Sequence, residues 1–187
     1  MLRTLGYVDQ DNIVQLKGRV ACELTNSDEV LVTELVMENV LDDLQPAELV
    51  ALLSCFVFQE KTQSPPVLTD RLQKRVEEFR RVATNVGNVQ VECGLSIAVS
   101  DYVALLNFNL AEVVYEWANG MSFKQITDLT DVPEGSIVRC IVRLDETCRD
   151  VRNAARVIGD NRLFNLAAEA SALIKRDIIF AASLYYA

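Results

Sequence analysis

EGSIVRCIVRLDETCRDVRNAARVI, residues 134–158, is the stretch that decides the fold of this chain. Successive residues of an α-helix are rotated by about 100°, and at that spacing the apolar side chains fall on one stripe. This stripe contains Ile137, Ile141, Leu144, Cys148, Val151, Ala155 and Ile158. The opposite stripe is polar and contains Arg139, Arg143, Glu146, Asp150 and Asn153. The pattern predicts a two-faced helix of roughly seven turns, about twice the usual length in globular proteins, which can cross a whole domain.

Signals for both ends of this helix stand in the flanking sequence. Asp131 is a candidate N-cap, because Glu134 follows it at the three-residue spacing of a capping box. Pro133 suits the first turn, where its missing N–H leaves no hydrogen bond unmade. Gly159 suits the left-handed conformation that commonly follows a last turn. We therefore expect one uninterrupted helix over about 132–158.

The length and composition indicate a folded domain with a substantial apolar core. The chain has 187 residues, 50% of them hydrophobic, and a net charge of −9. The negative charge argues against a general nucleic-acid binder, because neutralising phosphates requires Lys and Arg. The excess is uneven, however: residues 1–120 contain nine basic and eighteen acidic side chains, and residues 121–187 contain nine of each. The long helix therefore lies in the part of the chain whose charges balance.

The residue types exclude most catalytic and metal-binding chemistry. The chain has no His, which removes Ser-His-Asp and Cys-His catalytic sites and the common His-containing metal sites. Its five cysteines form no C-x-x-C pair, and we interpret them as small buried side chains in a reducing compartment. No phosphate-binding loop, dinucleotide-binding glycine pattern or acidic metal cluster is present. We therefore expect no catalytic residue and no metal site, and the lack of a signal peptide or long apolar run predicts a soluble intracellular protein.

The remaining sequence predicts a helical bundle preceded by a short β-hairpin. Residues 7–24 read as strands about a turn at Asp11 and Asn12, which is typical of a hairpin. Further helices are expected over about 26–41, 46–59, 68–86, 99–119, 123–129 and 160–186. Capping-box spacings mark two of their starts, at Asn26 and Ser122. The last helix ends in almost wholly apolar turns, which should dock against another surface. The expected fold class is all-α, a helical bundle with the long amphipathic helix at its centre.

The polar stripe of the long helix allows more than one interpretation. Arg139 and Arg143 lie one turn apart, and Glu146 follows three residues later. Such a row can bind phosphates or sugars, and it can equally be a solvated face with internal salt bridges. Residues 123–144 also have helix-turn-helix spacing, but the second helix is too long and the chain too acidic to favour sequence-specific DNA binding. A buried structural pair of helices explains the same spacing.

Six blocks of sequence resemble one known family. They are LKGRVAC (16–22), LVTEL (31–35), VVYEWANGMSF (113–123), TDVPEGSIVRCIVRLDE (130–146), AARVIGDNRL (154–163) and KRDIIFAASLYY (175–186). The last four, in this order, resemble the C-terminal DSHCT domain of the superkiller-type DExH-box RNA helicases, which are cofactors of the exosome. The first two resemble the segment that joins the winged-helix domain to this bundle in the same family. The resemblance implies that residues 1–25 are the last hairpin of a winged-helix domain and that residues 26–187 are the DSHCT helical bundle. It also implies that residues 132–158 are the ratchet helix, which lines the RNA channel in this family.

The same resemblance implies which residues bind RNA. Arg143 and Glu146 stand at the positions that match RNA-facing residues of the ratchet helix. Arg139 joins them by helical spacing alone. ATP and Mg²⁺ are expected only in the RecA-like motor domains, which this chain lacks, so the chain by itself should have no ATPase site.

The amino-acid sequence of the long helix is more similar to the cytoplasmic superkiller branch than to the nuclear branch. This similarity implies an ATP-dependent 3′-to-5′ RNA helicase that unwinds RNA and feeds it to the cytoplasmic exosome for decay. The implied partners are single-stranded RNA, the motor domains of the same protein, the tetratricopeptide and propeller subunits of the superkiller complex, and the exosome, with no membrane. Two alternatives stay open, a nuclear exosome-cofactor helicase of the same family and a non-catalytic helical interaction module.

Overall fold

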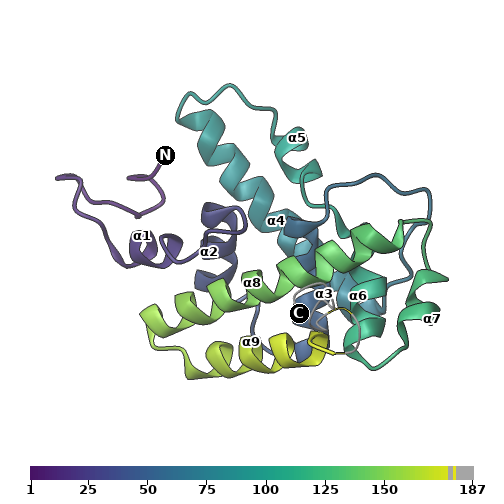
Figure 1. The fold of residues 1–187 in the computed structure, drawn as a ribbon. Coiled ribbons are helices and arrows are strands. Elements are labelled where there is room, and N and C mark those ends of the chain that lie inside the picture. Colours follow the sequence, from purple (N-terminus) through teal and green to yellow (C-terminus); the bar gives the residue numbers. More distant parts are fainter. Residues whose placement is uncertain (177–178, 180–187) are drawn as a thin grey trace, which may run out of the picture.

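The computed structural model describes residues 1–176 and 179, which form helices joined by irregular connections (Figure 1). In chain order the elements are α1 (Leu16–Ala21), α2 (Glu29–Met37), α3 (Pro46–Val57), α4 (Asp70–Glu92), α5 (Val99–Ala104), the 3₁₀ helix η1 (Phe108–Leu110), α6 (Ala111–Ala118), α7 (Phe123–Thr127), α8 (Glu134–Ile158) and α9 (Asn161–Ile174). The described residues contain no β-strand, and the expected all-α class is confirmed. No helix among them is both long and apolar enough to cross a lipid bilayer.

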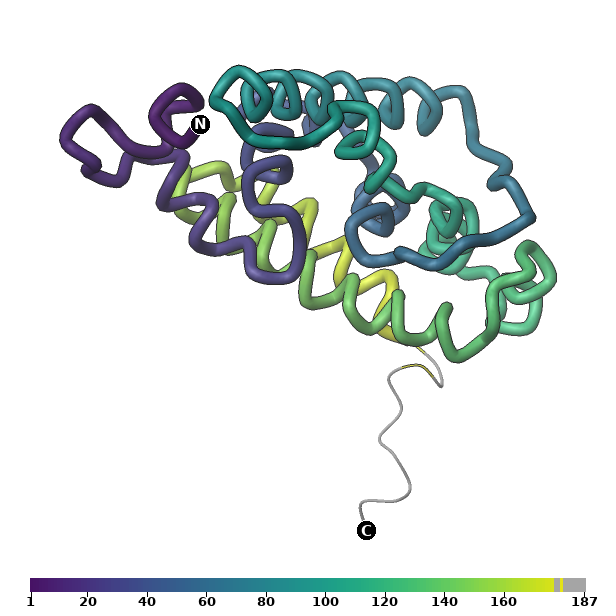
Figure 2. The backbone as a smooth tube through the Cα atoms, turned by 90° about the horizontal axis from the view of Figure 1, so that it is seen from above, coloured from purple at the N-terminus to yellow at the C-terminus, as the bar shows by residue number. Residues whose placement is uncertain are grey.

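The centre of the bundle is α3, and α8 lies against it. Leu49, Val50 and Leu53 are fully buried, because α3 packs against α4, α6, α8 and α9. Its start follows the sequence signal, with Pro46 in the first turn and the Glu48 carboxylate accepting a hydrogen bond from the Gln45 amide at 2.7 Å. Figure 2 shows α4 along one side of the molecule and α8 along the other, with α3 between them. The helix α3 is buried on nearly all sides, whereas α8 buries one face, with Ile137, Ile141 and Leu144, and exposes the other.

The helix α8 spans Glu134–Ile158, within two residues of the expected range. Gly159 ends it with φ of 78°, and the Asp160 amide donates to the Ala155 carbonyl at 2.9 Å, as in a glycine-terminated helix. The start differs, because Pro133 is the N-cap residue and Asp131 does not cap. Asp131 instead accepts hydrogen bonds from the Thr62 hydroxyl and, at 3.0 Å, from the Gln63 amide. It thereby fastens the connection after α3 to the N-terminal end of α8.

The expected N-terminal hairpin is not formed. Residues 7–15 make a turn closed by a single bridge between Val8 and Val14, and the following segment is the helix α1. Gly18 allows this, because a Cβ atom there would lie 2.5 Å from the Tyr7 carbonyl oxygen. The close approach lets Val20 reach full burial in the core. Burial of this helix face outweighs the strand-like alternation of the sequence.

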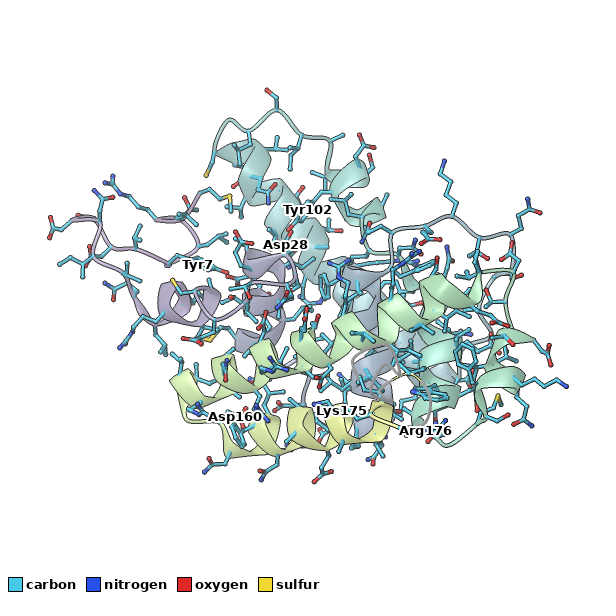
Figure 3. All side chains as sticks on the ribbon, in the orientation of Figure 1. Tyr7, Asp28, Tyr102, Asp160, Lys175 and Arg176 are labelled. Carbon is cyan, nitrogen blue, oxygen red and sulfur yellow. The ribbon has the colours of Figure 1, made fainter. Side chains whose placement is uncertain are left out.

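The helix α2 begins at a residue other than the one that the capping-box spacing indicates. Asp28 is the N-cap, and its carboxylate accepts from the Leu31 amide at 2.8 Å and from the Tyr102 hydroxyl at 2.8 Å (Figure 3). Asn26, the expected cap, instead donates to Asp150 of α8. The N-cap side chain of α2 thus holds α5 as well as the first turn of α2.

Two further helices differ in length from their sequence patterns. The helix α4 continues through Gly87 to Glu92, and Gly87 is where α5 crosses it, since an added Cβ would lie 3.1 Å from Val99. The single helix expected over 99–119 is divided into α5, η1 and α6. Asn107 lies at the division, and its side chain donates to the Glu60 carbonyl at 2.8 Å. The Asn107 backbone amide donates to the Cys55 carbonyl at 3.4 Å instead of to a carbonyl of α5, so the helix does not continue through it.

Trp117 of α6 anchors the end of α9. The indole is fully buried, and its N–H donates to the Ile174 carbonyl at 3.0 Å. The Arg176 guanidinium lies 3.5 Å from the centre of the indole ring, and it donates to the Trp117 carbonyl at 2.7 Å. Figure 3 shows Lys175 and Arg176 where α9 ends. The expected docking of the apolar C-terminal turns concerns residues 177–187, which lie outside the described residues apart from the buried Ile179.

Candidate nucleic-acid interface

The exposed face of α8 carries more basic than acidic side chains, although the helix as a whole contains nearly equal numbers of both. Of its four acidic residues, Asp145 and Asp150 are buried, so only Glu134 and Glu146 are exposed. The exposed arginines are Arg139, Arg143, Arg149 and Arg156. The balanced charge of the helix is therefore divided, with two carboxylates inside and most guanidinium groups outside.

The two buried carboxylates have structural partners. Asp150 was expected on the polar stripe, but its Oδ2 atom accepts from the Thr25 amide at 2.8 Å and from the Asn26 amide at 2.9 Å. It also accepts from both side chains of that segment, at 3.2 Å and 3.0 Å. The side chain therefore holds the connection between α1 and α2 and is not available to a ligand.

Asp145 links α8 to α9. It accepts from the Ser171 hydroxyl at 2.6 Å and forms ion pairs with Lys175 at 2.9 Å and Arg149 at 3.4 Å. Burial acts to raise the pKa of Asp145, but the Ser171 and Lys175 hydrogen bonds and the two positive charges outweigh it, so the pKa lies below its ordinary value. Asp145 thus stays ionised at neutral pH and fixes the orientation of α8 relative to α9.

The two residues expected to face RNA are both free to bind a ligand. Arg143 and Glu146 are exposed and lie three residues apart on the same face of α8. Neither the guanidinium nor the carboxylate makes a hydrogen bond or an ion pair with another part of the chain that the structure describes. A guanidinium can donate two parallel hydrogen bonds to phosphate oxygens, and a carboxylate can accept from hydroxyl and amino groups. The pair therefore offers complementary groups to a sugar-phosphate chain.

Arg139 lies beside them but has partners within the chain. Its Nη2 atom donates to the Ser136 hydroxyl at 2.8 Å and lies 3.5 Å from Oε1 of Glu60. The Ser136 hydroxyl in turn donates to Oε2 of Glu60 at 3.0 Å. The structure brings all three predicted residues onto one face, but it adds a carboxylate next to the first of them.

A small hollow connects these groups. Its volume is about 100 Å³, and its lining consists of Val57, Phe58, Gln59, Glu60, Ser136, Arg139, Cys140 and Arg143. The two sides come from the connection after α3 and from the first half of α8, which are 76 residues apart in sequence at Glu60 and Ser136. No local spacing could indicate this pairing, so the sequence analysis missed Gln59, Glu60 and Ser136.

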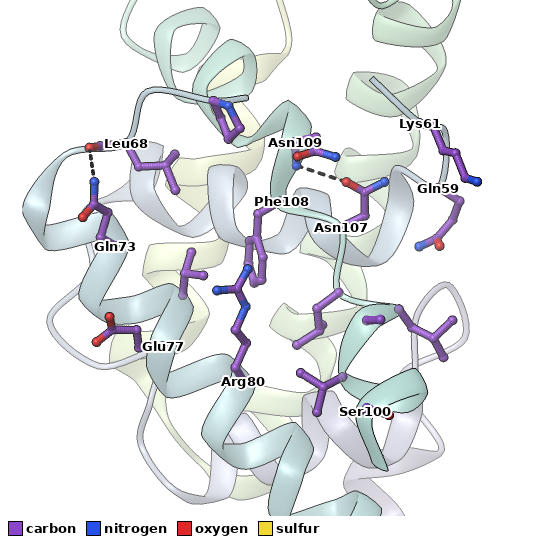
Figure 4. A pocket seen from close by; sticks show the side chains of 16 residues that line it. Gln59, Lys61, Leu68, Gln73, Glu77, Arg80, Ser100, Asn107, Phe108 and Asn109 are labelled. Carbon is purple, nitrogen blue, oxygen red and sulfur yellow. Dashed lines mark hydrogen bonds between the residues drawn. The ribbon is translucent and has the colours of Figure 1, made fainter. Parts of the chain in front are cut away.

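A larger hollow lies elsewhere (Figure 4). Its volume is about 810 Å³, and α4, α5, η1 and the connection around residues 59–68 surround it. Arg80 lies over the ring of Phe108 at 5.8 Å, with amides such as Gln73 and Asn107 at the rim. No residue of α8 lines it, and it therefore does not contain the predicted RNA-facing residues.

The cysteines confirm the sequence interpretation only in part. Cys55, Cys140 and Cys148 are buried, and burial raises the pKa of the Cys140 and Cys148 thiols to about 12. Cys22 and Cys93 are exposed, contrary to expectation. Across residues 1–176 and 179, no group of three or more Cys, Asp or Glu side chains is arranged to hold a metal ion.

Comparison with known proteins gives the family. The model of the DSHCT (NUC185) domain matches residues 11–181. Superkiller complex protein 2 of Homo sapiens is 49% identical over 185 residues, which cover 99% of this chain and 15% of that protein. Exosome RNA helicase MTR4 of Homo sapiens is 43% identical over 185 residues, covering 99% of this chain and 18% of that protein. Antiviral helicase SKI2 of Saccharomyces cerevisiae is 43% identical over 190 residues, covering 99% of this chain and 15% of that protein.

These identities establish the family, but they do not separate its superkiller branch from its MTR4 branch. The chain spans 15% to 18% of the length of these relatives. The yeast SKI2 protein and the human MTR4 protein are equally similar to it, at 43% identity. By the extent of the family match, this chain belongs to the DSHCT (NUC185) domain family.

Proposed function

We propose that this chain is the C-terminal RNA-channel domain of an ATP-dependent 3′-to-5′ RNA helicase that delivers RNA to the exosome. The observation that carries the proposal is the pair Arg143 and Glu146, which has no partner among the described residues, on the cation-rich outward face of α8. Relatives named as RNA helicases, one of them an exosome RNA helicase, support the reaction class. In this proposal α8 is the ratchet helix, and RNA passes along its exposed face.

The chemistry of the two side chains suits a translocating RNA. Arg143 donates hydrogen bonds to phosphate oxygens, since its planar guanidinium matches their geometry. Glu146 accepts from a ribose 2′-hydroxyl or a base amino group, which orients the strand. Glu146 also limits the local positive charge, so each contact is weak enough to release as the strand moves. Arg139 is the third contact of the proposal.

The remaining elements of the helicase belong to segments outside this chain. RecA-like motor domains of the full-length protein bind ATP and Mg²⁺, and ATP hydrolysis there supplies the energy for movement along RNA. The proposed partners are single-stranded RNA, these motor domains, the tetratricopeptide and propeller subunits of a superkiller complex, and the exosome. Within the family we propose the cytoplasmic superkiller branch, because the sequence of the long helix resembles that branch more than the nuclear one.

A double substitution in the full-length protein tests the proposal. Arg143→Ala combined with Glu146→Ala should lower RNA-stimulated ATPase activity and unwinding at least several-fold, because both groups face solvent and only RNA contacts are lost. A matched control is Lys74→Ala combined with Glu77→Ala, an exposed cation and acid at the same spacing on α4. Equal thermal midpoints would show that both variants are folded.

Unchanged ATPase and unwinding in the α8 variant would refute the channel role. The helical domain would then be an interaction module with a solvated polar face.

A further inference from the structure

Glu60 is a carboxylate that the fold holds beside the proposed RNA contact. It follows the C-terminal end of α3, and its carbonyl accepts from the Asn107 side chain at 2.8 Å. Two and three residues further on, Thr62 and Gln63 donate to Asp131, just before α8. The segment is therefore fastened on both sides, and the position of Glu60 next to α8 does not depend on its own ion pair.

The Glu60 carboxylate occupies the groups that a phosphate would use. Its Oε1 atom lies 3.5 Å from Nη2 of Arg139, and its Oε2 atom accepts from the Ser136 hydroxyl at 3.0 Å. A carboxylate and a phosphate present the same kind of oxygen acceptor to a guanidinium. Glu60 thus satisfies Arg139 and Ser136 in the way that an RNA phosphate would satisfy them.

The ion pair between Arg139 and Glu60 can be broken at little cost in stability. The Arg139 and Glu60 side chains are 72% and 48% exposed, and ion pairs at such exposure contribute little to stability. The hollow of about 100 Å³ beside them also contains Arg143, which has no ion-pair partner among the described residues. This volume corresponds to about three water molecules, so a phosphate group can enter once the side chains adjust.

We propose that Glu60 competes with RNA phosphate for Arg139. Arg139 then binds an RNA phosphate only when that phosphate displaces the Glu60 carboxylate. The inference rests on the proposed function, because it presumes that RNA passes along α8. Glu60 weakens RNA binding and speeds release of each phosphate, which a translocating enzyme needs. Glu60 therefore sets the affinity of a backbone contact and touches no reacting atom.

The test is RNA binding by the full-length protein, measured by fluorescence anisotropy with a labelled single-stranded oligouridine at several salt concentrations. Glu60→Gln keeps an oxygen that accepts from Ser136 but removes the charge. We expect it to tighten binding about two- to five-fold, because Arg139 then binds a phosphate without first breaking an exposed ion pair. The slope of log K against log salt should steepen by about 0.7, since one more phosphate is neutralised.

Three companion variants isolate the mechanism. In an Arg139→Gln background, Glu60→Gln should produce no further tightening. Glu38→Gln is the matched control, since Glu38 pairs with Arg81 at 2.8 Å on other helices and should not alter binding. Arg143→Ala reports on the proposed function itself and should weaken binding.

The outcomes separate the two proposals. Unchanged or weaker binding by Glu60→Gln would overturn the competitor role, and so would equal tightening in the Arg139→Gln background or in the Glu38→Gln control. If Arg143→Ala still weakens binding in such a case, only the inference about Glu60 fails. If Arg143→Ala, Arg139→Gln and Glu60→Gln all leave binding unchanged, the proposed RNA channel fails with it.

Discussion

Replacing Asp150 with Ala removes a buried link between α8 and the N-terminal segment. Four donors, the amides and side chains of Thr25 and Asn26, converge on its Oδ2 atom at 2.8 to 3.2 Å. A hydrogen bond to a charged group contributes about 1.5 to 3 kcal/mol, but Thr25 is exposed, so water can satisfy part of what is lost. Removing the carboxylate also relieves the cost of burying it. The net loss of unfolding free energy should be about 2 to 4 kcal/mol.

Urea unfolding of the 187-residue chain, followed by circular dichroism, measures this loss. Asp150→Asn, which keeps one acceptor oxygen, should fall between the wild type and Asp150→Ala. Glu146→Ala is the matched control, because it removes an exposed acid of the same helix that has no partner among the described residues, and it should change stability by less than about 0.5 kcal/mol. If Asp150→Ala cost no more than Glu146→Ala, the link would contribute nothing and the reasoning would be wrong.

Two further substitutions test the packing around α9. Trp117→Ala should cost about 3 to 5 kcal/mol, because it empties a fully buried site and removes the donor to Ile174, and the thermal midpoint should fall by about 6 to 20 °C; an unchanged midpoint would contradict the burial. Asp145→Asn should be less stable than the wild type at pH 7, with the gap closing below about pH 4. The sign follows from the pKa of Asp145, which is lower in the folded state, so its contribution is present above the unfolded-state pKa and is lost as the pH falls through the folded-state value. A gap that stayed constant through acid titration in chemical unfolding would refute the assignment.

Local signals predicted the helix ends that are set by residues close in sequence. The range of α8 followed from apolar spacing and Gly159, the start of α3 from Pro46, and the start of α7 from the capping box at Ser122. In each case the deciding residues lie within a few positions of the element that they define. Periodicity and caps are sufficient where the signal and the structure are both local.

Long-range contacts account for the elements that the sequence analysis missed. The strand-like pattern of residues 7–24 was overridden because Gly18 lets α1 pack against the Tyr7 backbone. Asp150 has the helical spacing of a solvent-facing residue, yet its partners lie more than 120 residues earlier in the chain. Asp131 has a capping-box spacing, yet it binds the connection after α3. Each of these residues has a partner that no single-sequence pattern contains.

One part of the candidate site could be predicted from local sequence, and another part could not. Exposure of Arg143 and Glu146 followed from their angle on the helix, and the structure confirms it. Their role in RNA binding stays a prediction that came from the family resemblance. Glu60 and Ser136 complete the hollow through a contact across 76 residues, so only the fold could reveal them.

A structure of the full-length protein with single-stranded RNA bound is the most direct test of the central claim. RNA should lie along α8, with phosphate oxygens within about 3.2 Å of the Arg143 guanidinium and a hydroxyl or amino group within hydrogen-bond distance of Glu146. RNA that is ordered in the protein while Arg143 and Glu146 face solvent or another protein segment would contradict it.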